Sequence, residues 1–318
     1  MSSDTSTSRV EQFLSALHAS GYAPVDVQAD GRWHRFKTND DKHKQTTGFY
    51  KVEPDYSWAI YGDWRRDPAH ISWKPDADEL SPEEARRNRE EIRRHRREQL
   101  RLEQFRQSEA ASVASTIWSA AQPLSAFPYA QRKRIPVHGL RLTQSYPKRD
   151  GSPTRRAYML IPIFGFDGKI WSLQFIPAFG NKLFLPDGKK KGCYFPFGPI
   201  GQTVIVAEGY ATGATIRAAT KLPVLAAFDA GNLLPVCRNI RKHYRSTKII
   251  IAADNDWETK GNPGLNKARN AAMDVGAKIV YPTQSALRPG ESDFNDLYLQ
   301  YDNQRQGLAE IKKCFKEI

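Results

Sequence analysis

The stretch at residues 249–264, IIIAADNDWETKGNPG, leads from five apolar residues directly into two aspartates one residue apart. Such an apolar run, followed by Asp, Asn and Gly, is typical of a buried strand that ends in a loop. The neighbouring carboxylates of Asp254 and Asp256 repel each other, which costs stability unless a cation lies between them. Mg²⁺ prefers hard oxygen ligands, so the pair is a candidate metal site. The alternative is a solvated turn before a helix, because Asp and Asn favour turns.

The composition indicates a polyanionic partner. The chain has 318 residues, enough for two or three domains, and its 48 Lys and Arg against 35 Asp and Glu give a formal charge of +13. That balance favours nucleic acid over a membrane surface, because there is no strongly apolar helix to anchor at a membrane, and no apolar run is long enough to span a bilayer. The N-terminus does not resemble a secretory signal, and the three cysteines are far apart. We therefore expect a cytoplasmic protein without disulfides and without a Cys₄ zinc ribbon.

Residues 31–75 are rich in aromatic and basic side chains and contain four of the seven tryptophans. Alternating aromatic and polar positions between Asp, Asn and Gly predict a small antiparallel sheet. Aromatic rings interleaved with cations suit single-stranded DNA, because bases stack on the rings while the cations meet phosphates. The alternative is that the rings build the core of the sheet. The candidate single-strand-binding residues are Trp33, Arg35, Lys42, Lys44 and Trp64.

The composition and the hydrophobic pattern of the remaining chain change several times. A long helix with many Arg and Glu is followed by short strands between Gly and Pro turns, punctuated by basic residues. After Gly201, continuous apolar strands alternate with amphipathic helices, which predicts an α/β domain with a parallel sheet covered on both faces. The predicted segments are an aromatic and basic β-rich domain at 1–76, a charged helical linker at 77–122, a basic α+β segment at 123–200, the α/β domain at 201–300 and a C-terminal helix at 301–318.

Acidic residues follow several strands of the predicted α/β domain. Glu208 follows TVIVA, and Asp254 and Asp256 follow IIIAA, while Asp293 and Asp296 lie in the loop segment ESDFNDLY. Ligands of open parallel sheets bind at the carboxyl ends of the strands, so one edge of the sheet could gather these carboxylates. A cluster of like charges is tolerable with divalent cations. Helix capping is the alternative role, and it suits Asp293 and Asp296 best.

The motifs VIVAEGYATGATI, IIIAADND and SDFNDL resemble the acidic motifs of the Toprim fold, which is shared by DnaG-type primases, topoisomerases and some nucleases. The preceding segment, with RRAYMLIPIFGFDGKIWSLQFIP and KKGCYFPFG, is similar to the basic half of the primase catalytic core. The pattern GRWHRF…GFY…YGDW resembles the leading segment of primases carried by conjugative plasmids and related mobile elements. The resemblance implies a Toprim parallel-sheet domain preceded by a basic primase-core subdomain and a small β-rich N-terminal domain.

The resemblance also implies roles for individual residues. Glu208, Asp254, Asp256 and Asp293 match catalytic acids and metal ligands of the family, and Asp296 is a further candidate ligand. Gln174 stands where cellular primases have an arginine. Cellular primases also begin with a zinc ribbon, which this chain lacks. The implied nucleotide- and template-binding residues are Arg155, Arg156, Gln174, Lys182, Lys190 and Lys191.

The resulting hypothesis is a DNA primase that makes short RNA primers by nucleotidyl transfer. It would use two or more Mg²⁺ or Mn²⁺ ions, no zinc, ribonucleoside triphosphates and a single-stranded DNA template. A replicative helicase or a single-stranded DNA-binding protein is a candidate further partner, and no membrane is expected. Two alternatives stay open: a Toprim nuclease using the same acids, and a non-catalytic single-stranded DNA-binding protein.

Overall fold

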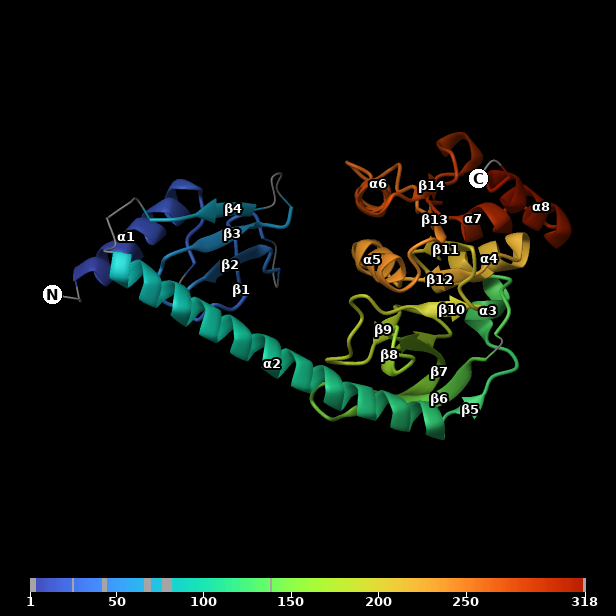
Figure 1. Ribbon diagram of the computed structural model, residues 1–318, viewed down its shortest axis with the longest axis horizontal. Helices are drawn as coiled ribbons and strands as arrows, with labels where there is room; N and C mark the ends of the chain where they lie inside the picture. The colour runs from blue at the N-terminus through green and yellow to red at the C-terminus, as the bar shows by residue number, and fades with distance from the viewer. Residues whose placement is uncertain are drawn as a thin grey trace. The chain divides into compact units, whose positions relative to one another are not determined.

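Three separate sheets organise residues 4–24, 26–41, 45–65, 70–75, 82–137 and 139–316, which the computed structural model describes (Figure 1). The chain divides into two compact units, Met1–Leu100 and Arg101–Ile318. The division falls inside one long helix, whereas the sequence suggests boundaries at residues 76 and 122, so the five-segment division stays a prediction. Among the described residues, no helix combines the length and the apolar character that crossing a membrane requires.

The first unit contains the antiparallel sheet predicted for residues 31–75. Its strands follow one another in space in the order β1-β2-β3-β4. Helix α1 supplies Phe13 and Leu17, which are fully buried against Tyr50 and Tyr61 on one face of the sheet. The sheet therefore forms a core with a single helix. The elements are α1 (Asp4–Ala19), β1 (His34–Phe36), β2 (Gly48–Val52), β3 (Ala59–Asp63) and β4 (His70–Trp73).

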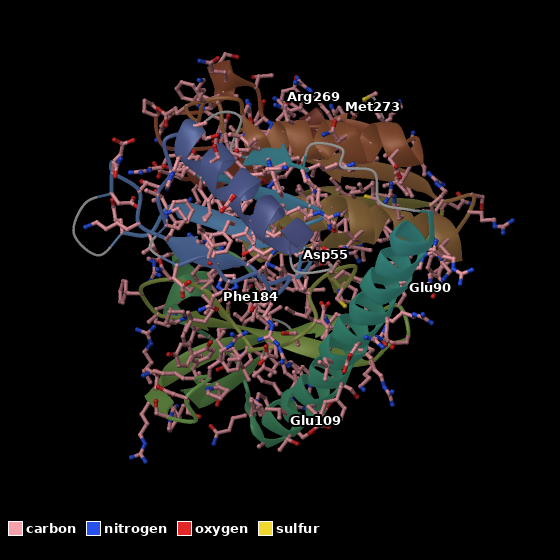
Figure 2. The ribbon with its side chains drawn as sticks, turned by 90° about the vertical axis from the view of Figure 1, so that its left-hand side faces the viewer. Asp55, Glu90, Glu109, Phe184, Arg269 and Met273 are labelled. Atoms are coloured by element: carbon pink, nitrogen blue, oxygen red, sulfur yellow. The ribbon has the colours of Figure 1, made fainter. Side chains whose placement is uncertain are left out.

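Helix α2 (Pro82–Ala120) is the charged helix that the sequence predicts. Exposed acids such as Glu90 and Glu109 lie along it (Figure 2), and Arg86 pairs with Glu90 one turn later. Near its C-terminal end, Ala110 and Ala114 are buried against the second sheet. The helix therefore belongs to the second unit from Arg101 onward, and its last turns pack against the second sheet.

The second sheet is antiparallel and has the order β5-β6-β7-β8-β9. The predicted hairpin turn at Phe166–Lys169 joins β7 to β8, and Gly168 adopts the left-handed conformation (φ +75°) that the tight turn requires. The elements are β5 (Gln122–Pro123), α3 (Pro128–Arg132), β6 (Arg141–Pro147), β7 (Pro153–Phe164), β8 (Ile170–Pro177) and β9 (Leu183–Phe184).

The third sheet has the order β10-β12-β11-β13-β14, in which β10 is antiparallel and the other four strands are parallel. The α/β class predicted from the alternating strands and helices is confirmed. The elements are β10 (Phe195–Phe197), β11 (Thr203–Ala207), α4 (Tyr210–Thr220), β12 (Val224–Ala226), η1 (Ala230–Asn232), α5 (Leu233–His243), β13 (Lys248–Ala252), α6 (Pro263–Val275), β14 (Lys278–Val280), η2 (Gln284–Ala286), α7 (Phe294–Leu299) and α8 (Gln304–Cys314).

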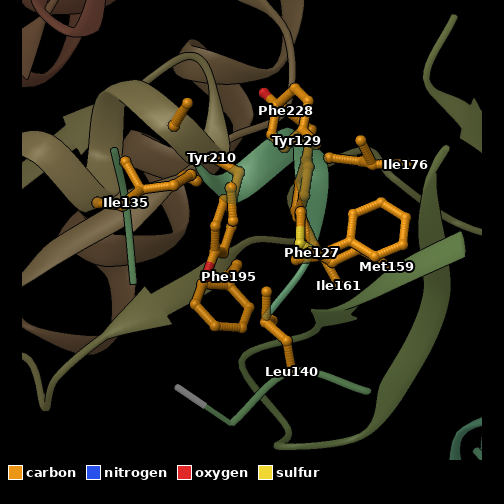
Figure 3. Close-up of a cluster of buried hydrophobic side chains, with 14 of the residues drawn as sticks. Phe127, Tyr129, Ile135, Leu140, Met159, Ile161, Ile176, Phe195, Tyr210 and Phe228 are labelled. Carbon is orange, nitrogen blue, oxygen red and sulfur yellow. The ribbon is translucent and has the colours of Figure 1, made fainter. Parts of the chain in front are cut away.

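A shared apolar cluster joins the second and third sheets. Met159, Ile161 and Ile176 of the antiparallel sheet pack with Tyr210 and Phe228 of the α/β domain (Figure 3). Burial of apolar surface at this scale fixes the two sheets against each other. Loops from the antiparallel sheet are therefore held at constant positions beside the α/β domain.

We expect the buried strand β13 to dominate the stability of the second unit. Ile251 is fully buried, so Ile251→Ala should lower the free energy of unfolding by about 2–5 kcal/mol. Lys248, exposed on the same strand, provides the control, and Lys248→Ala should change stability by less than about 0.5 kcal/mol. Urea unfolding followed by circular dichroism measures both. Equal effects of the two changes would contradict a buried central strand.

Candidate active site

The register of two parallel strands brings the first acids together. β11 and β13 are neighbours, and Ala207 is the direct partner of Ala252. Glu208 and Asp254 follow these positions at the same edge of the sheet. Both residues are half-buried, and Oδ1 of Asp254 is buried without a hydrogen-bond donor among the described residues.

Asn255, between the two aspartates, fixes the loop that carries them. Its backbone N–H donates to the carbonyl of Ser292 (2.8 Å), and its buried Nδ2 donates to the carbonyl of Pro282 (2.9 Å). Asn262 donates to Asn255 Oδ1 (2.7 Å). These bonds tie the Asp-x-Asp loop to the segment that carries the last acidic motif.

Asp256 and Asp293 accept hydrogen bonds from the protein itself. Asp256 Oδ2 accepts from the backbone N–H of Gly264 in the first turn of α6 (3.3 Å). A side chain at position 264 would crowd this carboxylate, because a Cβ on Gly264 would lie 2.8 Å from Asp256 Oδ2. Asp293 caps α7: its Oδ1 accepts from the N–H groups of Asn295 and Asp296, and its Oδ2 accepts from the hydroxyl of Thr212 (3.0 Å). The predicted capping role of Asp293 is therefore present, in a position beside the other acids.

The five acids influence one another electrostatically. Burial, followed by the charges of Asp293, Glu208, Asp256 and Asp296, raises the pKa of Asp254 well above its usual value. Burial and Asp256 raise the pKa of Glu208, and burial and Asp296 raise that of Asp293. Each shift favours the neutral acid. A raised pKa means that ionising the cluster costs stability.

Lys133, which follows α3, provides a cation that the sequence did not suggest. Its Nζ lies 3.1 Å from Oδ1 of Asp296. Burial disfavours its charge, but Asp293 and Asp296 outweigh burial and raise the pKa of Lys133. Asp296 Oδ2 accepts from the N–H of Ser292 (3.1 Å), so both of its oxygens are engaged.

The donor set fits a divalent cation, although the side chains are not closed around one. Among the described residues, no three His, Cys, Asp or Glu side chains are arranged to enclose a metal ion. The hydrogen bonds of Asp256, Asp293 and Asp296 explain the open arrangement, because these carboxylates already accept from N–H groups of the protein. The buried Asp254 Oδ1 without a donor is an unfilled acceptor, and an all-oxygen set suits Mg²⁺ or Mn²⁺.

The basic loop Lys190–Cys193 is fastened to the α/β domain. Asn232 is 3% exposed; its Oδ1 accepts from the N–H of Gly192 (2.7 Å), and its Nδ2 donates to the carbonyls of Lys190 (3.0 Å) and Cys193 (2.9 Å). Lys190 Nζ also lies 2.5 Å from Asp229, whose charge contributes to the raised pKa of Glu208. The loop therefore presents Lys190 next to the acidic edge.

The other predicted basic residues are less closely tied to the acids. Lys182 and Lys191 are exposed, and Lys182 Nζ lies 5.6 Å from the centroid of the Tyr129 ring. Arg155 and Arg156 are exposed on β7, and among the described residues neither pairs with an acid of the cluster. Gln174 is 4% exposed within β8, and its Oε1 finds no donor there. Their contacts with nucleotide or template stay predictions.

The predicted N-terminal residues belong to the other unit. Trp33 and Trp64 are exposed beside β1 and β3, and Arg35 is exposed on β1. Lys42 and Lys44 lie outside the described residues. The aromatic residues thus lie on a surface separate from the acidic cluster in sequence and in structural unit.

Sequence reasoning missed Lys133, Asp229, Asn232 and Asn255. Lys133 reaches Asp296 across 163 positions, and Asn232 reaches Lys190 across 42. No local motif encodes such contacts. Asn255 carried a usable signal, because an Asn between two functional aspartates has to point away from them.

Comparison with known proteins identifies the α/β domain. Residues 203–303 match the family model of the Toprim domain. The chain contains a Toprim domain. The matched residues include Glu208, Asp254, Asp256, Asp293 and Asp296, and so the whole acidic cluster.

Most of the chain is also similar to primases. One protein named DNA primase TraC, from Escherichia coli, is 33% identical over 278 residues, which cover 83% of this chain and 25% of the relative. A second protein of that name and organism is 30% identical over 288 residues, 86% of this chain and 19% of the relative. This chain therefore spans about a quarter and a fifth of these relatives. The resemblance of the motifs to Toprim-containing primases is confirmed.

A solved structure of the DnaG primase catalytic domain bound to ssDNA is 12% identical, with a TM-score of 0.47, over 66% of this chain and 80% of that chain.

The raised pKa of Asp254 predicts that its charge destabilises the chain at neutral pH. Because the folded state favours the neutral acid, stability falls as pH rises from the usual value of 3.8 through the raised pKa. Without divalent cations, Asp254→Asn should therefore raise the melting temperature at pH 7.5 by about 2–4 °C, which corresponds to ~1 kcal/mol. The gain should shrink near pH 4, where Asp254 itself is neutral.

Asp274 is the matched control for this melting experiment. It is an exposed aspartate whose pKa is lowered by its ion pair with Arg238. Asp274→Asn should leave the melting temperature unchanged or slightly lower. Adding Mg²⁺ should stabilise the wild type more than Asp254→Asn. A lower melting temperature for Asp254→Asn in EDTA would contradict the charge repulsion.

Proposed function

We propose that this chain is the catalytic part of a DNA primase, which joins ribonucleotides into short primers on a single-stranded DNA template. The observation that carries the proposal is the edge of the parallel sheet, where Glu208, Asp254 and Asp293 have raised pKa values and Oδ1 of Asp254 has no hydrogen-bond donor among the described residues. The similarity to DNA primase TraC over 83% of this chain supports joining rather than cutting of nucleic acid. It also disfavours a purely DNA-binding role.

Glu208, Asp254, Asp256 and Asp293 would hold one or more Mg²⁺ or Mn²⁺ ions. When bound, such a metal would offset the charge of a triphosphate and of the departing pyrophosphate, and would lower the pKa of a 3′-hydroxyl. The protein contributes fixed positions: Asn255 holds the Asp-x-Asp loop, and α7 holds Asp293. Lys133 keeps Asp296 paired, which makes Asp296 a supporting residue more than a ligand.

The basic residues would bind phosphates around this edge. Lys190 already lies beside Asp229 next to the acids, so it is the candidate for the incoming triphosphate. The exposed Lys182, Lys191, Arg155 and Arg156 suit the backbone of a template strand. Phosphate contacts position a strand without reading its sequence. A replicative helicase as partner and a cytoplasmic location belong to the same proposal.

The direct test is primer synthesis by the purified chain. Wild type, Asp254→Asn and Asp256→Asn are incubated with circular single-stranded DNA, labelled ribonucleotides and Mg²⁺ or Mn²⁺. We expect short labelled oligoribonucleotides from the wild type and a loss of at least about 100-fold in each variant, because each removes a candidate metal ligand. Asp274→Asn should retain full activity. Degradation of labelled DNA without nucleotides would indicate a nuclease, and full activity in Asp254→Asn would overturn the proposed site.

Asn232 should position the nucleotide-binding loop. Asn232→Ala removes the hydrogen bonds to residues 190, 192 and 193, which are worth about 0.5–1.5 kcal/mol each. We expect the KM for ribonucleotides to rise about tenfold while kcat changes less. Asn239→Ala, which loses one bond to the carbonyl of Gly192, should have a smaller effect.

Lys190→Gln combined with Asn232→Ala tests whether the two residues act together. If Asn232 acts by positioning Lys190, the fold-increase in KM of the double variant should be smaller than the product of the fold-increases of the two single variants. A lower melting temperature with unchanged KM would show that Asn232 is a stability residue instead.

A further inference from the structure

The sheet of the first unit has two different faces. Paired residues of neighbouring strands point to the same face, and the register places Arg35, Phe49, Gly62 and His70 in one row across β1, β2, β3 and β4. The adjacent row, which includes Tyr50 and Tyr61, packs against α1. The row with Arg35 and Phe49 therefore lies on the face away from α1.

Two tryptophans flank the middle of this second face. The Trp64 ring stacks on Phe49, with centroids 4.2 Å apart and an interplanar angle of 30°. Trp33 meets the same Phe49 edge-on at 5.6 Å. Phe49 is 2% exposed, while Trp33 and Trp64 remain 58% and 54% exposed. The cluster thus buries its central ring and leaves large flat rings in contact with solvent.

The charges around the tryptophans favour an anionic ligand. The guanidinium of the exposed Arg35 lies 5.7 Å from the Trp64 ring centroid. The nearby carboxylates of Asp41 and Asp63 are buried and both pair with Arg65 (3.2 and 2.9 Å). Their negative charge is thereby neutralised within the protein. The exposed chemistry of this face is aromatic and cationic.

We propose that Trp33, Arg35, Phe49 and Trp64 form a stacking surface for the bases of single-stranded nucleic acid. Every base has a flat face that stacks on an aromatic ring, and Arg35 would meet the adjoining phosphate. Duplex DNA offers no free base faces, so the surface selects unpaired strands. The inference deepens the proposed function, because it states where a template strand is held, and it rests on that function only for the identity of the strand as template.

The test compares two probes that differ only in their bases. The full chain is titrated into a fluorescein-labelled 16-nucleotide oligothymidylate and into an abasic strand of the same length, and anisotropy gives both dissociation constants. Stacking is worth about 1–3 kcal/mol per base, so wild type should bind the thymidylate roughly 5- to 150-fold more tightly. Trp33→Ala with Trp64→Ala should abolish that preference and leave abasic binding nearly unchanged.

Conservative variants separate stacking from a merely structural role. Trp64→Leu still covers Phe49 with an apolar side chain, whereas Trp64→Phe also keeps a flat ring. A stacking surface requires Trp64→Phe to retain much of the preference and Trp64→Leu to lose it, at similar melting temperatures. Equal preference in both variants would overturn the proposal. Phe105, 65% exposed on α2, provides the control, and Phe105→Ala should bind like wild type.

Primer synthesis and strand stacking depend on different residues of the chain. Asp254→Asn should lose primer synthesis but keep the thymidylate preference. A wild type that makes no primers yet shows the preference would overturn the proposed function and support the stacking surface. A wild type that binds both probes equally would overturn the stacking surface.

Discussion

Ala207 and Ala252 are direct partners in neighbouring parallel strands, and this register places Glu208 and Asp254, one and two residues further on, at the same edge of the sheet. Hydrogen bonds and an ion pair from the surrounding residues offset the repulsion among the acids at this edge. Asp256 accepts from the first turn of α6, and Asp293 accepts from the first turn of α7, where backbone N–H groups and the helix dipole favour negative charge. Lys133 pairs with Asp296. The first turns of α6 and α7, together with Lys133, thus stabilise the carboxylates that gather at this edge.

The stability that the acids cost is supplied by the strands that carry them. Ile250 and Ile251 of β13 are at most 2% exposed, and they face two different apolar clusters on opposite sides of the sheet. Fully burying one such side chain contributes about 1.5–3 kcal/mol. A parallel sheet covered on both faces can therefore carry an edge of ionisable groups that no turn or isolated helix could carry. This is why a strongly apolar strand and an Asp-x-Asp motif occur together.

The sequence predicted those features that local patterns encode. Continuous apolar strands alternating with amphipathic helices indicated the parallel sheet, and the acids at the strand ends indicated its functional edge. It could not predict Lys133 or Asn232, because their roles exist only once the antiparallel sheet packs on the α/β domain through the Met159 and Tyr210 cluster. β10 shows the same limit: it precedes residue 201, yet pairs with β12. Gln174 was named from a family position, and its burial depends on β7 and β9 on either side.

The net charge of +13 does not neutralise the acidic edge, and the geometry explains why. Lys133 contacts Asp296, and Lys190 contacts Asp229, so each lysine is committed at the rim of the cluster. Among the described residues, the ammonium groups of Lys133 and Lys190 donate to these rim carboxylates and not to Asp254. Asp254 Oδ1 accordingly finds no donor among the described residues. A small divalent cation can approach several oxygens at about 2.1 Å, which no side chain of this protein can do. The described cations of the protein therefore leave Asp254 Oδ1 without a partner, which is what the proposed metal site requires.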